Sequence, residues 1–207
     1  MKGNQTINHH SYLIGLIFIL LVASCQRSQF ATTARHNHKG KVSYSNSFQT
    51  ELNFQPLERL DIRIAYRYLD VKQKLDGAWL ERPLTAQHRA LATISYAMER
   101  NHPDDPQTSL DVTLQWFGKK RIPETLLNPD SLRALAYSPS FLTMNLQVTR
   151  TFMKGIDVYL GIENLFNFRQ TNPILDSANP QGPFFDASLI WGPLTGRMIY
   201  AGLRLGV

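Results

Sequence analysis

The sequence predicts an all-β fold of about seven long antiparallel strands. Three observations predict it: apolar and polar residues alternate with a period of two, the alternating segments are long, and the connections between them are alternately short and long. Alternation with period two places successive side chains on opposite faces of a strand. The predicted sheet therefore has one apolar and one polar face.

Composition agrees with this fold and limits the function classes. The chain has 207 residues, 43% of them hydrophobic, 11% aromatic and 18% charged, with a formal net charge of +6. The aromatic content excludes a disordered chain. A bundle of membrane helices is excluded because each helix needs about 20 consecutive apolar residues. The single Cys25 excludes an intrachain disulfide and a Cys-rich zinc site.

Residues 1–24 are typical of a secretory signal peptide. A weakly basic start with Lys2 precedes an apolar run over residues 13–22, and the small residues Ala23 and Ser24 stand before Cys25. The run is too short to span a bilayer. Residues 22–25 also resemble a bacterial lipobox, in which the cysteine is acylated after cleavage. Two readings stay open: Cys25 is lipidated, or it follows an ordinary signal peptide.

Residues 25–45 are polar and lack periodicity, which predicts a linker or loop. His36 and His38 lie in this stretch without a carboxylate or a third ligand nearby. Two histidines alone are weak evidence for a metal site, so we expect solvated side chains and no bound metal.

The strands are expected from residue 46 onwards. The clearest spans residues 60–71, where Leu60, Ile62 and Ile64 alternate with Asp61 and Arg63. The same alternation predicts strands over residues 48–54, 90–98, 110–116, 142–149, 156–163 and 199–207.

Two architectures fit such strands. A soluble sandwich buries its apolar faces and uses strands of about 5 to 6 residues. An outer-membrane β-barrel turns its apolar face to lipid and needs about 9 to 11 residues per strand. The length of the segments and the near absence of charge on the apolar parity favour the barrel. Aromatic residues near strand ends agree with an interfacial girdle: Tyr66, Tyr68, Trp116, Phe117, Phe152 and Phe166.

The connections favour the same architecture. Residues 55–59, 101–107 and 153–155 form short connections, whereas 72–88, 118–140 and 167–197 form long ones. Short turns on one side and long loops on the other are typical of periplasmic and extracellular ends. This arrangement places the C-terminus on the periplasmic side and gives an odd number of strands.

Several segments resemble a known family. Residues 163–167, Glu-Asn-Leu-Phe-Asn, resemble the NLF(D/N) signature near the penultimate strand end of TonB-dependent outer-membrane receptors. Residues 191–197 and 199–205 are similar to the loop and closing strand of that family. Residues 55–60 and 83–89 also resemble motifs of its last strands. In this order and spacing, the resemblance covers about residues 46–207.

The resemblance implies a function for an intact receptor: uptake of iron-chelates, vitamins or oligosaccharides across the outer membrane of a Gram-negative type cell. It implies outer-membrane lipids, the barrel-assembly machinery and, for the intact receptor, the energy-coupling protein TonB as partners. The family's barrel has about 22 strands and a plug domain, and it commonly ends in an aromatic residue, whereas this chain ends in Val207.

We therefore expect residues 46–207 to form the C-terminal segment of such a barrel, which is not transport-competent alone. Two alternatives stay open. One is a small independent outer-membrane lipoprotein whose barrel closes by oligomerisation. The other is a secreted, ligand-binding β-sandwich.

Other chemistry has little support. His88 and His102 stand near no nucleophile, so we expect no catalytic residue and no enzyme activity. Without a Gly-rich loop after a strand we expect no nucleotide or other cofactor, and scattered basic residues give no nucleic-acid patch. Arg63 and Arg67 share the polar parity. They would either meet an anionic solute in the lumen or pair with carboxylates on neighbouring strands.

Overall fold

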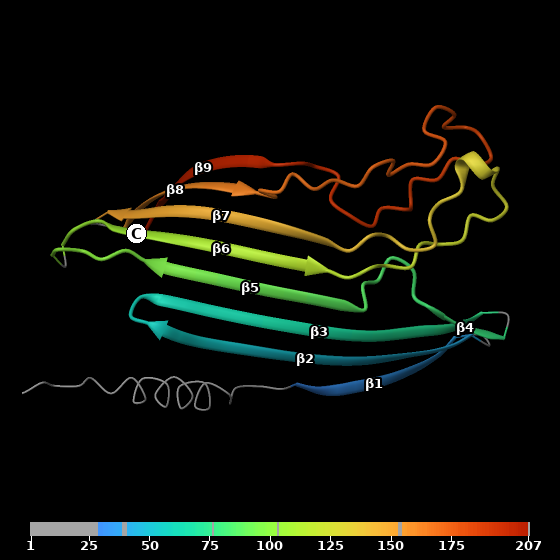
Figure 1. Ribbon diagram of the computed structural model, residues 1–207, viewed down its shortest axis with the longest axis horizontal. Coiled ribbons are helices and arrows are strands. Elements are labelled where there is room, and N and C mark those ends of the chain that lie inside the picture. The colour runs from blue at the N-terminus through green and yellow to red at the C-terminus, as the bar shows by residue number, and fades with distance from the viewer. Residues whose placement is uncertain (1–28, 39–40, 76, 103, 153–154, 207) are drawn as a thin grey trace, which may run out of the picture.

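The computed structural model describes residues 29–38, 41–75, 77–102, 104–152 and 155–206, with side chains described from residue 43 onwards. These residues form one antiparallel sheet in the order β1-β2-β3-β5-β6-β7-β8-β9, and β4 pairs with β3 (Figure 1). The bounds are β1 (Gln29–His38), β2 (Lys41–Leu57), β3 (Leu60–Leu75), β4 (Ala78–Glu81), β5 (His88–Ala97), β6 (Gln107–Phe117), β7 (Phe141–Phe152), β8 (Ile156–Glu163) and β9 (Met198–Leu205). A short 3₁₀-helix, Asp130–Leu132, lies between β6 and β7.

The predicted all-β, antiparallel fold is confirmed. The seven strands expected from apolar alternation are β2, β3, β5, β6, β7, β8 and β9. The sheet is wider than expected because β1 adds an eighth strand beside β2, so the number along the sheet is even rather than odd. The short β4 lies inside the expected long connection over residues 72–88 and forms a hairpin with the end of β3.

The expected linker over residues 25–45 is wrong where the structure describes it, because residues 29–38 form β1 and β2 begins at Lys41. The pairing runs from Gln29 opposite Gln49, through a register shift before Thr32, to His38 opposite Lys41. Backbone groups make these pairs, and their hydrogen bonds need no apolar side chains. A polar strand of this kind therefore has no alternating signature. Residues 1–24 and Cys25, and the side chains of His36 and His38, lie outside the described part of the chain.

The predicted asymmetry of the connections is also present. In Figure 1 the connections of residues 76–87, 118–140 and 164–197 leave the sheet at one end, beyond β3, β6 and β8. The turn of residues 58–59 and the shorter connection of residues 98–106 lie at the other end, where β7 also passes to β8. β1 ends at His38 and β2 begins at Lys41 at the long-loop end, where His38 stands opposite Lys41.

The register aligns the apolar residues of seven strands in continuous rows. Its central row consists of Phe54, Ile62, Ile94, Val112, Leu146, Ile162 and Ile199. The flanking rows are Leu57, Leu60, Tyr96, Leu110, Val148, Leu160 and Ala201 on the short-turn side, and Leu52, Ile64, Ala92, Leu114 and Met144 on the loop side. We call these three rows the apolar face. The opposite parity, which we call the polar face, includes Asp61, Arg63, Thr93, Ser95, Asp111, Thr113, Asn145 and Gln147.

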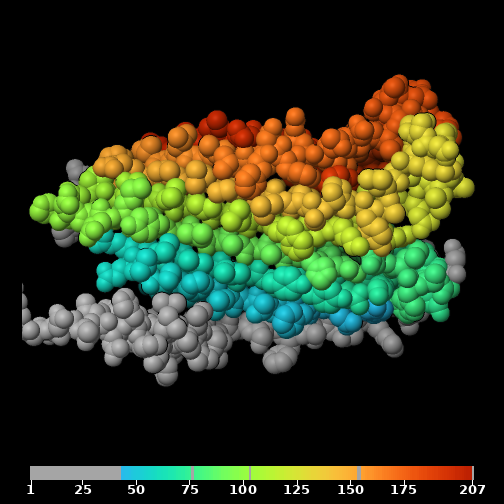
Figure 2. Space-filling model, viewed as in Figure 1, coloured from blue at the N-terminus to red at the C-terminus, as the bar shows by residue number. Residues whose placement is uncertain are grey.

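Burial is concentrated at the loop end rather than along the sheet. Among the described residues, the buried apolar side chains are Ala86, Ile122, Phe141 and Leu189, which lie in the long connections or at the adjoining end of β7. The strands form a single layer. In Figure 2 no second layer lies over the visible face of the strands. The sheet is open, because β1 and β9 each have only one neighbour in the described chain. The described residues thus form one sheet without a facing second sheet, which is not the arrangement of a β-sandwich.

Two tyrosine–glycine pairs fasten β9 to β8. Tyr159 stands opposite Gly202, and Gly161 stands opposite Tyr200. A Cβ atom at either glycine would collide with the tyrosine across from it, so each ring lies over a bare backbone. The Tyr200 hydroxyl also donates a hydrogen bond to Gln147 Oε1 on β7 at 2.8 Å. The last strand is therefore held by contacts that reach two strands away.

We predict that Gly161→Ala lowers the free energy of unfolding by about 1–3 kcal/mol, because the added methyl expels the Tyr200 ring. Urea titration of the folded chain measures the change. The control is the same substitution in a Tyr200→Ala background, where the ring is absent and the cost should largely vanish. An equal cost in both backgrounds would contradict the packing explanation.

Candidate functional site

No described part of the chain covers the apolar face. Ile64 is 45% exposed, Leu160 56% and Ile199 70%, although they lie on different strands of one sheet. Contiguous apolar patches on soluble monomers rarely exceed a few hundred Å², and burying such surface is worth about 25 cal/mol per Å². A face that extends across seven strands therefore requires a covering phase or partner.

Polar groups and aromatic rings limit the apolar face at its loop end. Going along β3, the apolar residues run from Leu60 to Tyr68, and Asp70 follows on the same parity. Nine residues lie at the lower end of the about 9 to 11 residues that a tilted strand needs to cross the hydrocarbon core of a bilayer. The Tyr44 hydroxyl donates to Asp70 Oδ2 at 3.1 Å, and Lys72 lies 3.7 Å from the other carboxylate oxygen.

The expected aromatic girdle is only partly on this face. Phe48, Tyr68 and His88 form one row next to the loops, and Tyr66 and Trp116 share the row beneath it. The Tyr66 hydroxyl lies 2.6 Å from His88 Nδ1, so this histidine has a structural contact. Phe117 is on the opposite parity, stacked on Phe141 with ring centroids 4.8 Å apart. Phe117 is therefore not a girdle residue on this face.

Cross-strand hydrogen bonds join the side chains of the polar face. Ser95 Oγ donates to Asp111 Oδ1 at 2.6 Å, and Gln55 Nε2 donates to Asp61 Oδ1 at 3.1 Å. Arg150, near the short-turn end on the apolar parity, donates instead to Thr108. A hydrogen-bonded polar surface on one side of a single layer suits contact with water. The two faces thus require different surroundings.

The two arginines singled out by the sequence have different environments. Arg63 donates a hydrogen bond to Glu51 Oε2 at 2.9 Å. Of the two arrangements that the sequence left open, Arg63 therefore has the ion pair with a carboxylate on a neighbouring strand. The pair is half exposed and contributes about 0–1 kcal/mol to stability. Arg67 stands directly opposite Arg89 of β5, so two like charges face each other across the strands.

Arg67 and Arg89 form a cationic cluster with Lys120, which lies just beyond β6. The Arg89 guanidinium lies over the Phe117 ring, 4.4 Å from its centroid. Lys120 Nζ lies 5.6 Å from the same ring centroid and 5.5 Å from that of Phe141. Within the described chain, none of the three cations forms an ion pair with a carboxylate. Burial lowers the pKa of the Lys120 amine below its usual value, and Arg89 lowers it further.

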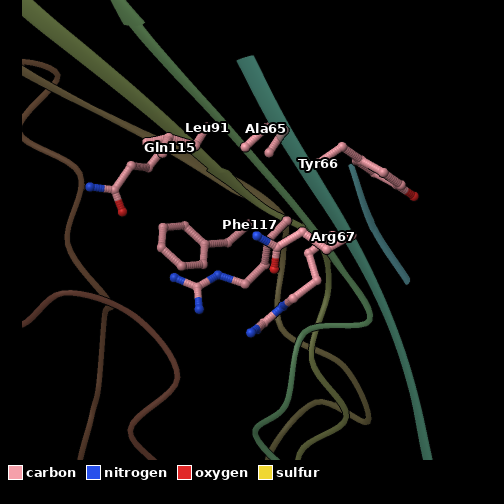
Figure 3. A pocket seen from close by; sticks show the side chains of 9 residues that line it. Ala65, Tyr66, Arg67, Leu91, Gln115 and Phe117 are labelled. Carbon is pink, nitrogen blue, oxygen red and sulfur yellow. The ribbon is translucent and has the colours of Figure 1, made fainter. Parts of the chain in front are cut away.

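A hollow of about 200 Å³ lies beside this cluster on the polar face. Its lining includes Gln49, Arg67, Arg89, Gln115 and Phe117. In Figure 3, Arg67 and Phe117 lie on one side of the strands, whereas Tyr66 points away from them. The hollow therefore combines cationic and amide donors with one aromatic wall.

Sequence reasoning missed Arg89 and Lys120. Arg89 directly precedes the expected strand over residues 90–98, and extending the alternation by one residue would place it on the polar parity. Its position opposite Arg67 depends on the register across a long connection, which no local pattern gives. Lys120 lies in a loop and carried no signal.

An aromatic cluster holds the long loops beside the hollow. Phe141 stacks on Phe168 with centroids 4.8 Å apart and planes inclined by 5°, and Trp191 lies against both rings. Lys120 Nζ donates to the backbone oxygen of Trp191. The buried Gln170 accepts from the backbone amides of Trp191 and Gly192 at 2.7 and 3.0 Å. Through these contacts the 164–197 connection holds the Lys120 side chain in place.

Asn164 connects two of the segments that carry the resemblance described above. It is buried and has a φ of +50°, a conformation that asparagine tolerates better than most residues. Its side chain accepts from the Phe168 amide at 3.1 Å and donates to the Phe168 and Thr195 carbonyls at 2.7 and 3.2 Å. Arg197 donates from Nε and from its guanidinium end to the Leu165 carbonyl at 3.0 and 2.6 Å. The turn after β8 and the segment before β9 are thus one hydrogen-bonded unit.

Three further findings concern function. Among the described residues, no three His, Cys, Asp or Glu side chains gather as they would around a metal ion. The same residues include no helix that is long and apolar enough to cross a membrane. No protein family, curated protein or solved structure matches the chain.

We predict that Asn164→Ala lowers the free energy of unfolding by about 1–3 kcal/mol, because buried partners on two segments lose their hydrogen bonds. Urea titration measures this, and limited proteolysis within residues 164–197 should become faster. Asn172→Ala is the matched control, since Asn172 also has a φ of +50°. Equal losses for both variants would mean that backbone strain, not hydrogen bonding, explains the effect.

Proposed function

We propose that this chain forms a section of the wall of an outer-membrane β-barrel of the TonB-dependent receptor type. The observation that carries the proposal is the uncovered apolar face across β2 to β9, backed by a hydrogen-bonded polar face. In a bilayer the apolar face would contact acyl chains and the polar face would line a hydrated lumen. Outer-membrane lipids are thus the proposed covering of the face.

The connections support the same proposal. Long connections at one end and short turns at the other correspond to the extracellular and periplasmic ends of such barrels. The resemblance of residues 163–167 and 191–205 to the family motifs gives further support, because Asn164 and Arg197 join those segments physically. Insertion would need the barrel-assembly machinery.

Uptake is proposed for the intact receptor and not for this sheet alone. The eight strands side by side do not enclose a channel. An unpaired backbone group in hydrocarbon costs several kcal/mol, so β1 and β9 need further strands in a membrane. Iron-chelates, vitamins or oligosaccharides remain the proposed cargo classes, with energy supplied through TonB to the intact receptor.

A second candidate is a barrel closed by identical copies, and the direction of the edge strands favours it. With eight antiparallel strands in order, β1 and β9 run in opposite directions. The β9 edge of one copy can thus pair antiparallel with the β1 edge of another while all long loops stay on the same side. An odd number of strands would not allow this.

The proposal is tested by expressing the complete chain in a Gram-negative host and fractionating the cells. We expect it in the outer membrane, extractable only by detergent, and migrating on gels differently with and without heating. Recovery as a soluble periplasmic protein would contradict the proposal and favour the secreted, ligand-binding alternative. Chemical cross-linking before electrophoresis distinguishes identical copies, which give multiples of the chain mass, from closure by other strands.

The face assignment gives a sharper prediction. Val112→Arg places a charge in the central row of the apolar face. It should make folding into phospholipid vesicles less favourable by about 2–4 kcal/mol. Thr113→Arg is the matched control, because it is the next residue of β6 on the polar face and should cost much less. Urea titration of vesicle-bound protein measures both. If Thr113→Arg is the more damaging change, the lipid-facing parity is wrong.

A further inference from the structure

Three cations meet on the polar face without a carboxylate. Arg67 and Arg89 are cross-strand neighbours, and Lys120 is close enough to Arg89 for that charge to lower its pKa. Residues 1–50 contain no Asp or Glu, and of the residues that the structure leaves undescribed only Asp76 is acidic. Among the residues that the structure describes, no carboxylate forms an ion pair with any of these three cations.

Like charges directly opposite each other destabilise a sheet. Two other strand arginines show a different arrangement: Arg63 pairs with Glu51 at 2.9 Å, and Arg204 lies 3.8 Å from Asp157. Arg67 and Arg89 instead line a hollow together with Gln49 and Gln115. An anion in that hollow would receive charge-assisted hydrogen bonds from guanidinium groups, whose planar fork suits carboxylate and phosphate oxygens.

The surroundings hold the cluster in place. The Phe117 ring lies under Arg89, and Phe117 and Phe141 lie beside Lys120. The backbone oxygen of Trp191 accepts from Lys120 Nζ, which fixes this cation from the longest loop. A pre-positioned set of donors loses little side-chain freedom on binding.

We propose that Arg67, Arg89 and Lys120 form a binding site for a soluble oxyanion with two or more negative charges, such as a polycarboxylate or a phosphate compound. The site lies on the face opposite the apolar rows, which is the wrong side for a lipid headgroup. This inference deepens the proposed function and depends on it for assigning the polar face to the lumen.

The test uses the complete chain folded in zwitterionic detergent, with citrate and pyrophosphate as probes in isothermal titration calorimetry. We expect binding that weakens as salt is raised, and a Kd at least about tenfold higher for Arg89→Gln. Arg63→Gln is the matched control, because Arg63 lies on the same face but already has Glu51; its Kd should change less than about twofold.

Stability separates binding from a structural role. Arg89→Gln removes a destabilising like-charge contact with Arg67 and a stabilising contact with the Phe117 ring, so its unfolding midpoint in urea should change little. A lowered midpoint, an equal loss of binding in Arg63→Gln, or no binding of either probe would overturn the inference. Binding of short-chain phosphatidylglycerol without binding of citrate or pyrophosphate would also overturn it, in favour of a lipid.

Vesicle insertion is measured on the same preparations. Insertion without anion binding overturns this inference and leaves the proposed function standing. Anion binding without insertion contradicts the barrel and leaves the site standing.

Discussion

The common register of seven strands is the constraint on which the other features depend. Side chains alternate with a period of two, so a slip of one residue in any strand would move its apolar residues to the polar face. The observed pairing avoids this from Phe54 on β2 to Ile199 on β9. One uninterrupted apolar surface is the result, and its size means that exposure to water would be energetically costly unless a phase or a partner covers it. The Tyr159–Gly202 and Gly161–Tyr200 pairs preserve the register at the last strand, where only one neighbour is present.

The loop end has a different physical basis. It contains the buried apolar side chains of the described chain, together with the buried polar residues Ser138, Asn164 and Gln170. Asn164 donates to the Thr195 carbonyl and Gln170 accepts from the Trp191 amide, and these hydrogen bonds replace those that water would otherwise make. The long connections are therefore packed on one another around Phe141 and Trp191. That packing fixes Lys120 beside two arginines of the sheet, so loop order and the cationic cluster have a common cause.

Local patterns were informative where one face of a strand is apolar and the other is not. Leu60, Ile62 and Ile64 identified their strand and its orientation without any tertiary information. The same reasoning failed for residues 29–38, whose polar side chains leave no trace of the pairing with β2. It also assigned Phe117 to the aromatic girdle. That assignment used only the position of the residue at a strand end, and this position does not tell which face of the sheet the ring lies on. The structure places that ring in a stack with Phe141 and beneath Arg89.

The sequence by itself determined the all-β class, seven of the strands, the two faces and the alternation of short and long connections. These features depend on residues that are near neighbours in the chain, with periodicity as the signal. Only the tertiary structure decided that β1 widens the sheet, that Arg63 is paired, and that Arg67 meets Arg89 and Lys120. Those relations join residues separated by long connections, and backbone pairing across such connections depends on the register of the whole sheet rather than on any local pattern.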